Sequence, residues 1–324
     1  MYPTMLTNIA FYYYLIYTPI QFWPCEAQTH VAMRSFGLPQ HGTTAGIFHD
    51  KGKAIIEIAH LDAYTQYSLL LGTPTHDPML SSYFPLVPYS NRIANGQFKW
   101  EDKSFNLNPN HSGQKFPLHG IGWLSEWAVK DIKENSCSLE YKHIEGDWPW
   151  PFLVRQKIVL EDSSIKISLT LKNMGKKIMP SGLGFHPYFP LSRDVKLQFN
   201  AEDVWLSDKN NLPTELVKIP NQWDFSKLGR VFNTKVDNCF SGYGGKANII
   251  ESSWRHQINL SSSPSLDHCV FYAPSKGDYF CFEPVNHMNN ALAHYNDSGA
   301  PEMPSLKPGE INHVEMSLSV IKNT

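Results

Sequence analysis

The sequence has few cysteines and no excess of basic residues. It therefore lacks the features that mark disulfide scaffolds, zinc ribbons and nucleic-acid-binding proteins. Its cysteines are odd in number, widely spaced and free of any Cys-x-x-Cys pair: Cys25, Cys137, Cys239, Cys269 and Cys281. We expect reduced, mostly buried thiols. The 28 basic and 30 acidic residues give a net charge of −2. Without a basic excess, no nucleic-acid partner is expected.

Long helices and nucleotide-binding loops are lacking as well. No long stretch carries a hydrophobic stripe with the 3.6-residue period of a helix. No GxGxxG opens a helix, and no P-loop is present. His287 and His294 have no supporting ligand cluster at metal-binding spacing. We therefore expect neither a metal nor another cofactor.

The first forty-five residues do not match the rest of the chain. Residues 5–24 are aromatic and apolar, and a small-x-small triplet at Cys25 follows them, as in a signal peptide. However, no Lys or Arg precedes Arg34, and Pro19 argues against a membrane-spanning helix. A signal within residues 1–27, an extension of uncertain order over 1–45 and a start-site artefact all remain open. We expect a cytoplasmic protein without membrane association that stays soluble and active when it begins near Met33 or Gly46.

Short segments with alternating apolar and polar residues recur over the remaining chain. They are separated by turn-forming residues and lie about 8–12 residues apart, the spacing of an all-β sandwich or barrel. No internal repeat or linker divides them, so we predict one domain over 46–324. The predicted strands cover 53–59, 97–101, 105–107, 127–132, 136–143, 154–160, 165–171, 195–199, 248–250, 257–260, 268–272, 279–283 and 314–321.

A histidine in a glycine- and proline-rich stretch, residues 181–191, is the first candidate for chemistry. Two glycines precede His186, and Pro187 and Pro190 follow it. Glycine permits close backbone approach and proline fixes φ, so the stretch is a rigid loop or strand end and not a helix. An ordinary histidine titrates near pH 6.5, which suits proton donation. The alternative is a core histidine wedged between aromatic rings.

Glu283 is the second candidate, because it interrupts an apolar strand end and Pro284 follows it. If buried, its carboxylate needs a partner, and desolvation would raise its pKa toward that of a useful base. A partly exposed glutamate at the strand end is the alternative.

Four further polar residues lie in distinctive local sequences: Asn91, Arg92, His119 and Asp237. Each also has a structural interpretation. Arg92 could form a salt bridge, His119 could pack in a loop, and Asp237 with Asn238 could form a turn.

Taken in order, these motifs resemble the aldose 1-epimerases, or galactose mutarotase-like proteins. The resemblance runs from about Lys53 to Val320 and is carried by Asn91-Arg92-Ile93 with Gly96 and Phe98, Leu118-His119-Gly120 with Trp127, His186-Pro187-Tyr188-Phe189, Asp237 and Glu283-Pro284. It implies a large antiparallel β-sandwich, the galactose mutarotase-like supersandwich, with a sugar bound in an open cleft.

The resemblance also implies roles. His186 would be the general acid on the ring oxygen and Glu283 the general base on the C1 hydroxyl. Asn91, Arg92, His119 and Asp237 would bind the sugar. The expected partner is a free aldohexose such as galactose or glucose, the expected protein a monomer or homodimer. On this basis the histidine pKa is expected to lie above that of the glutamate.

Two departures from the family leave alternatives open. An early Gly-Gly turn is replaced here by Leu61-Asp62-Ala63-Tyr64. Related hexose-6-phosphate epimerases carry an arginine soon after the His-Gly pair, whereas Ile121-Gly122-Trp123-Leu124 offers none. A phosphorylated sugar is therefore disfavoured. A sugar-binding module without turnover is a further alternative, but a pure binder needs no acid–base pair.

Overall fold

The structure, a computed structural model, describes residues 32–37, 42–50, 53–61, 66–68, 83–133, 135–144, 146–161, 163–251, 256–275, 277–297 and 299–322. The signal-like segment within 1–27, Cys25 and residues 62–64 of the altered early turn lie outside these ranges. None of the helices in the described part of the chain has the length and hydrophobicity that a membrane crossing requires. The cytoplasmic location stays a prediction.

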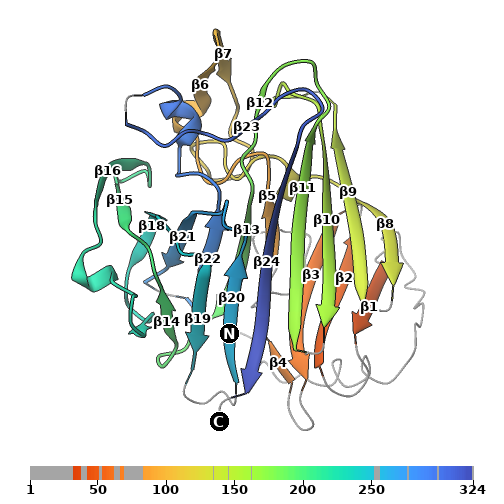
Figure 1. The fold of residues 1–324 in the computed structure, drawn as a ribbon, viewed down its shortest axis with the longest axis vertical. Helices are drawn as coiled ribbons and strands as arrows, with labels where there is room; N and C mark the ends of the chain where they lie inside the picture. Colours follow the sequence, from red (N-terminus) through yellow and green to blue (C-terminus); the bar gives the residue numbers. More distant parts are fainter. Residues whose placement is uncertain are drawn as a thin grey trace, which may run out of the picture.

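One layer of the fold is a nine-stranded antiparallel sheet (Figure 1). Its strands pair in the order β17-β14-β19-β20-β24-β11-β10-β9-β8. In chain order they are β8 (Ala128–Lys133), β9 (Ser136–His143), β10 (Phe152–Glu161), β11 (Ser164–Asn173), β14 (Lys196–Phe199), β17 (Gly229–Arg230), β19 (Lys246–Ile250), β20 (His256–Ser262) and β24 (Ile311–Lys322).

A seven-stranded antiparallel sheet forms most of the facing layer. It is ordered β16-β15-β18-β21-β22-β13-β5. Its strands are β5 (Tyr83–Leu86), β13 (Gly184–Pro190), β15 (Asp203–Ser207), β16 (Pro213–Lys218), β18 (Val236–Ser241), β21 (His268–Ala273) and β22 (Tyr279–Val285).

A four-stranded sheet continues this facing layer beyond β5. β3 lies against β5, and β2 lies against β10 and β11 of the nine-stranded sheet. The four strands pair in sequence order: β1 (Ala32–Gly37), β2 (Gly42–Asp50), β3 (Lys53–Leu61) and β4 (Gln66–Ser68).

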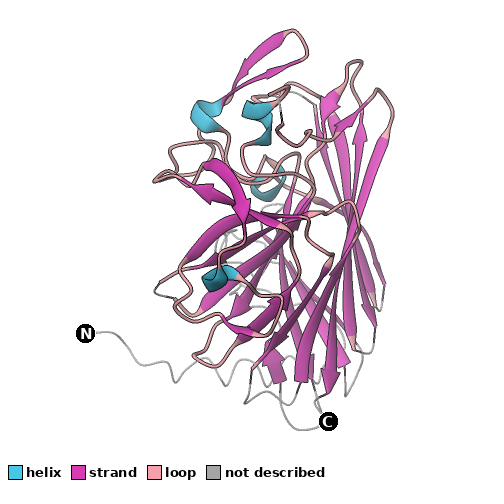
Figure 2. Cartoon of the chain, turned by 60° about the vertical axis from the view of Figure 1, so that its left-hand side comes forward, coloured by secondary structure: helices cyan, strands magenta, loops and turns pink. Residues whose placement is uncertain are grey.

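The remaining elements are short and lie on the connections between the large sheets (Figure 2). They are two strand pairs, β6 (Gln97–Trp100) with β7 (Lys103–Asn106) and β12 (Met179–Pro180) with β23 (Ser305–Leu306), and the 3₁₀ helices η2 (Ala94–Gly96), η3 (Gly122–Leu124), η4 (Asn221–Trp223) and η5 (Ala291–His294).

Aromatic side chains fill the space between the two main sheets. Phe199 of β14 lies 5.2 Å from Phe240 of β18 and 4.9 Å from Phe282 of β22, measured between ring centroids. Phe185 and Phe189 of β13 are fully buried on the same side of their sheet. Because neighbouring residues of a strand point to opposite faces, this packing sends the residues between the phenylalanines to the other face.

The all-β antiparallel sandwich is confirmed, and every predicted strand overlaps an observed one. The sequence analysis missed β1, β2, β4, β5, β15, β16, β17 and β18, and also the two-residue strands β12 and β23. Asp237 and Asn238, which could have formed a turn, lie inside β18. Residues 184–190 form β13, so the stretch around His186 is a whole strand and not only a strand end.

The predicted domain start at residue 46 falls within β2, whose residues from Gly42 to Asp50 pair with β3 from Leu61 to Lys53. A chain that starts at Met33 keeps nearly all of β1, whereas one that starts at Gly46 loses β1 and four residues of β2. We therefore expect the Gly46 chain to have a lower melting temperature than the Met33 chain, because β3 loses part of its hydrogen-bonded partner. Equal melting temperatures would contradict this expectation and favour an extension that ends at residue 45.

Candidate active site

The face of the seven-stranded sheet that points away from the aromatic core carries a cluster of polar side chains. β13 pairs with β22 in a register that joins Gly184 to Val285 and Tyr188 to Cys281. In this register His186 lies opposite Glu283. The two paired residues begin a row across the sheet that β21 and β18 extend. Val270 of β21 pairs with Glu283 on one side and with Cys239 of β18 on the other. The sheet register therefore places the two strongest candidates side by side.

His186 and Glu283 form a close, buried pair. The Nε2 atom of His186 lies 3.2 Å from Oε1 of Glu283, and the two side chains are only 7% and 3% exposed. Aromatic rings enclose the imidazole: Phe84 is stacked on it at 4.3 Å, and Tyr188 lies at 4.8 Å. The alternative for His186 is partly met, because it is wedged between rings but also contacts a carboxyl group. The alternative for Glu283, a partly exposed glutamate, is wrong because the side chain is buried.

Burial sets the protonation of this pair. Desolvation lowers the pKa of His186 to about 3, because the apolar rings disfavour the imidazolium form. Desolvation also raises the pKa of Glu283 well above its usual range, and the negative charge of Asp237 adds to that rise. The order is therefore the reverse of the sequence expectation. Burial therefore favours the neutral form of each group, imidazole at His186 and carboxylic acid at Glu283.

Arg92 and Asp237 provide the charges around the pair. The Arg92 guanidinium lowers the pKa of Glu283 and of Asp237, but burial outweighs it in both cases and the two pKa values stay raised. Asp237 lies two residues from Cys239 on β18, hence on the same sheet face as Glu283. The two charged residues predicted to bind substrate therefore lie within electrostatic range of the pair.

Two adjoining loops bring Asn91, Arg92 and His119 to this face. The backbone N–H of Asn91 donates to Nδ1 of His119 at 3.1 Å, and the N–H of His119 donates to the carbonyl of Asn91 at 2.9 Å. Since Nδ1 accepts, Nε2 of His119 carries the proton. The His119 ring meets that of His186 edge to face at 5.0 Å. Gly120, at φ +71°, passes so close to Val87 that an added Cβ would lie 2.2 Å from its carbonyl oxygen.

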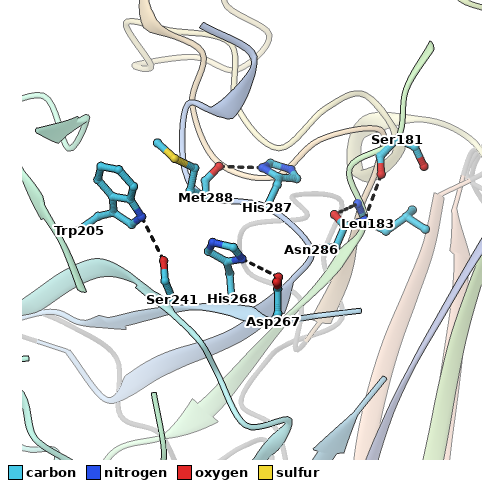
Figure 3. Close-up of polar contacts among 9 residues, drawn as sticks. All are labelled: Ser181, Leu183, Trp205, Ser241, Asp267, His268, Asn286, His287 and Met288. Atoms are coloured by element: carbon cyan, nitrogen blue, oxygen red, sulfur yellow. Dashed lines mark hydrogen bonds and ion pairs between the residues drawn. The ribbon is translucent and has the colours of Figure 1, made fainter. Parts of the chain in front are cut away.

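Polar residues just after β22 hold these parts together, and the sequence analysis did not identify their role. Asn286 accepts from the N–H of Leu183 and donates to the carbonyl of Ser181, ahead of β13 (Figure 3). His287 accepts from the N–H of Ser90 at 3.0 Å and donates to the carbonyl of Met288. Asn290 accepts from the N–H of Ala94. The segment after Glu283 thus fixes the strand of His186 and the loop of Arg92.

Several buried polar atoms in this region have no hydrogen-bond partner among the described residues. They are Ser90 Oγ, His186 Nδ1, His268 Nε2, Glu283 Oε2 and Asn289 Oδ1. An unpaired buried polar atom costs about 1–3 kcal/mol. Unpaired atoms on both His186 and Glu283 are therefore typical of a site that binds a polar ligand.

The structure brings together all six residues predicted from the sequence: Asn91, Arg92, His119, His186, Asp237 and Glu283. Their individual roles stay predictions.

The donor atoms of His186, Glu283 and Cys281 all lie within 4.8 Å of one another. This group was missed because its members lie on two strands almost a hundred residues apart, with no metal-binding spacing in the sequence.

Comparison with known proteins relates residues 40–319 to the family model of aldose 1-epimerases. The uncharacterized protein YphB of Escherichia coli K12 is 33% identical over 249 residues, which make up 74% of this chain and 84% of that protein. An aldose 1-epimerase of Haemophilus influenzae is 26% identical over 212 residues, 60% of each chain. The crystal structure of a candidate aldose 1-epimerase from E. coli K12 superposes with a TM-score of 0.80 at 28% identity, covering 90% of this chain and all of that one.

The buried histidines predict acid sensitivity of the fold. Burial lowers the pKa of His119, His186 and His287, the last to about 4, whereas unfolded histidines titrate near 6.5. Between these values the unfolded chain binds more protons at these positions, so their contribution to stability is lost as pH falls from about 6.5 toward 4. The raised pKa of Glu283 opposes this trend, because its penalty shrinks as pH falls toward its unfolded value.

A single variant isolates one of these protons. His287→Gln can still accept from Ser90 but no longer titrates. Between pH 6 and 4.5 its unfolding free energy should fall less steeply than that of the wild type, by up to about 1.4 kcal/mol per pH unit. Denaturant unfolding at a series of pH values measures the slope, with His313→Gln on the exposed face of β24 as control. Equal slopes for wild type and His287→Gln would show that His287 titrates alike in both states.

Proposed function

The chain belongs to the aldose 1-epimerase family, and from this premise we propose that it interconverts the α and β anomers of a free aldohexose such as galactose or glucose. The reaction is an acid–base opening and re-closure of the sugar ring. The observation that carries the proposal is the buried pair of His186 and Glu283, 3.2 Å apart, with one unpaired atom on each partner.

The chemistry requires two groups and one transferable proton. One group removes the proton from the C1 hydroxyl while the other protonates the ring oxygen, and the C1–O5 bond breaks to give the open-chain aldehyde. Rotation about C1–C2 presents the other face of the carbonyl, and the same transfers in reverse close the ring. The C1 hydroxyl oxygen and the ring oxygen are both bonded to C1, so two adjacent side chains can reach both oxygens. Such acid–base catalysis needs no metal or nucleotide.

The family assigns the acid to His186 and the base to Glu283. The neutral arrangement, with the proton on Glu283, holds the same number of protons, and burial favours it. Protonated glutamate and neutral histidine can start the reaction in the opposite sense, with Glu283 protonating O5 and His186 accepting from the C1 hydroxyl. Either assignment requires the one-proton state of the pair.

The surrounding residues suit a neutral, hydroxyl-rich ligand. Arg92 and the Nε2–H of His119 can donate hydrogen bonds, whereas Asp237 and the free Oε2 of Glu283 can accept them. Phe84 and Tyr188 offer apolar surface beside the pair. These groups match the ring hydroxyls and C–H faces of a hexose, and the absence of an arginine after Gly120 supports an unphosphorylated sugar over a hexose 6-phosphate. A binding module without turnover on the same fold would have no use for the close acid–base pair.

Removing either member of the pair should abolish most of the activity. We expect Glu283→Gln and His186→Asn to lower kcat for mutarotation of α-galactose or α-glucose at least about a hundredfold, as general acid–base groups contribute on the order of 10²–10⁴-fold. Polarimetry of freshly dissolved α-anomer, against the uncatalysed rate, measures the effect. Glu140→Gln, which removes a carboxylate bound to Arg155 on the other sheet, is the control and should keep wild-type turnover. Near-normal turnover by Glu283→Gln would rule out its role.

The position of the proton is open to a direct test. The one-proton state exists above the pKa of His186 and below that of Glu283, so we expect kcat/KM to fall in acid as His186 gains a proton and in alkali as Glu283 loses one. The pH profile shows how many protons the pair carries but not which of the two residues carries them. Infrared difference spectra between wild type and Glu283→Gln at neutral pH should contain the carbonyl stretch of a protonated carboxylic acid. A carboxylate band in its place would put the proton on His186.

His287 should affect activity without contacting the sugar. His287→Ala leaves the N–H of Ser90 without its acceptor, which frees the loop that carries Arg92. We expect KM to rise more than kcat falls, because Arg92 is proposed to hold substrate and not to transfer protons. His287→Gln should restore much of the loss by supplying an acceptor. Loss of kcat alone, or no rescue by glutamine, would contradict a positioning role.

A further inference from the structure

Cys281 adds a third donor atom to the buried pair, and mutarotation has no role for it. The residue lies two positions before Glu283 on β22 and opposite Tyr188 of β13. Its side chain is completely buried, and its sulfur forms no disulfide. One donor atom each from His186, Cys281 and Glu283 lie within 4.8 Å of one another.

This arrangement has the composition of a transition-metal site. Imidazole nitrogen, thiolate sulfur and carboxylate oxygen are the ligands of tetrahedral zinc, with bonds of about 2.0–2.3 Å. Ligand atoms of such a centre lie about 3.3–3.8 Å apart by that geometry. The Nε2–Oε1 distance of 3.2 Å is already close to this value, and the sulfur lies within 4.8 Å of both other ligand atoms.

The surroundings favour a cation in two further ways. Oε2 of Glu283 is buried and has no hydrogen-bond partner in the described part of the chain, so a metal ion would use lone pairs that are otherwise unsatisfied. Asp237 adds negative charge near Glu283, partly offset by Arg92. Three protein ligands leave a fourth position open to water, as in zinc sites that are not purely structural.

We propose that His186, Cys281 and Glu283 form an inhibitory site for zinc or a similar thiophilic divalent ion. On binding, the ion displaces the proton of the Cys281 thiol and the proton shared by His186 and Glu283, and both pass to solvent. The ion then occupies the acid–base pair, so metal and sugar exclude each other. The exclusion of sugar rests on the proposed mutarotase function, whereas metal binding does not.

Cobalt provides a readout that is independent of activity. Titration of tag-free, full-length protein with CoCl₂ should produce a thiolate-to-cobalt charge-transfer band that saturates at one equivalent and disappears on addition of ZnCl₂. Cys281→Ser should lose the band, and Cys281→Ala tests the same point if serine disturbs folding. Glu283→Gln should weaken binding while keeping the thiol.

Cys239→Ser is the matched control. Cys239 is a buried thiol on the same sheet face, separated from Glu283 by Val270 in the row of paired residues. This variant should keep the cobalt band. A band that persists in folded Cys281→Ser or disappears in Cys239→Ser would overturn the site, as would the lack of saturable binding by wild type.

Polarimetry then tests the inhibition. Zinc should inhibit wild-type mutarotation competitively with galactose. Each variant is compared with its own metal-free rate, and the inhibition constant of Cys281→Ser should rise by more than about tenfold, because even changes to residues that only support a metal ligand cost 10–100-fold in affinity. Non-competitive inhibition would place the ion away from the pair. If the protein proves to have no mutarotase activity, the cobalt result still decides the metal site.

Discussion

The strict alternation of side chains along the seven-stranded sheet is the constraint on which the rest of this molecule depends. β13 and β22 direct Phe185 and Phe282 into the space between the sheets, so His186 and Glu283 must point the opposite way. A slip of one residue would exchange the two sets and place charged groups in the aromatic core. The packing that stabilises the sandwich therefore also fixes which residues reach the candidate site, and the antiparallel register fixes that the two meet.

The region around the pair holds many buried polar groups, and only some of them have hydrogen-bond partners. Asn286, His287 and Asn290 each accept from the backbone N–H of a residue about 100 or more positions away in the sequence. His186 Nδ1 and Glu283 Oε2, in contrast, remain unpaired. Unpaired polar atoms on reactive residues, beside supporting residues that are hydrogen-bonded, are expected at a site that binds a ligand. A bound sugar, or an ion, would give these unpaired atoms the partners that they lack.

Much of the architecture could be predicted from the sequence, because most strands alternate clearly between apolar and polar residues. The sequence did not predict β18, because Asp237 and Asn238 are typical turn residues. Inside the sheet, however, the amide of Asn238 donates to the carbonyl of Trp205 at 2.8 Å, and this bond satisfies it within a strand. The six site residues were identifiable through ordered motifs, although periodicity alone would not have joined them.

Other features of the site could not be predicted, because they depend on contacts between distant parts of the chain. His287 acts on Ser90, 197 residues away, and Cys281 joins His186 only through the pairing of β13 with β22. The order of the pKa values of His186 and Glu283 could not be predicted for the same reason. A nearby carboxylate would raise a histidine pKa in water, but the rings of Phe84 and Tyr188 remove the water that stabilises both charges.

The protonation of the pair changes during the proposed reaction. If the shared proton starts on Glu283, ring opening moves one proton from Glu283 to the ring oxygen and another from the C1 hydroxyl to His186. The open-chain sugar is then neutral beside a Glu283 carboxylate and a His186 imidazolium. In a medium of low dielectric constant these charged forms are less stable than the neutral pair, and the 3.2 Å contact between the two groups offsets part of that difference. Ring closure returns both protons and restores the neutral pair. Because both anomers open to the same state and use the same two groups, burial affects α-to-β and β-to-α conversion equally, as a catalyst of anomeric equilibration requires.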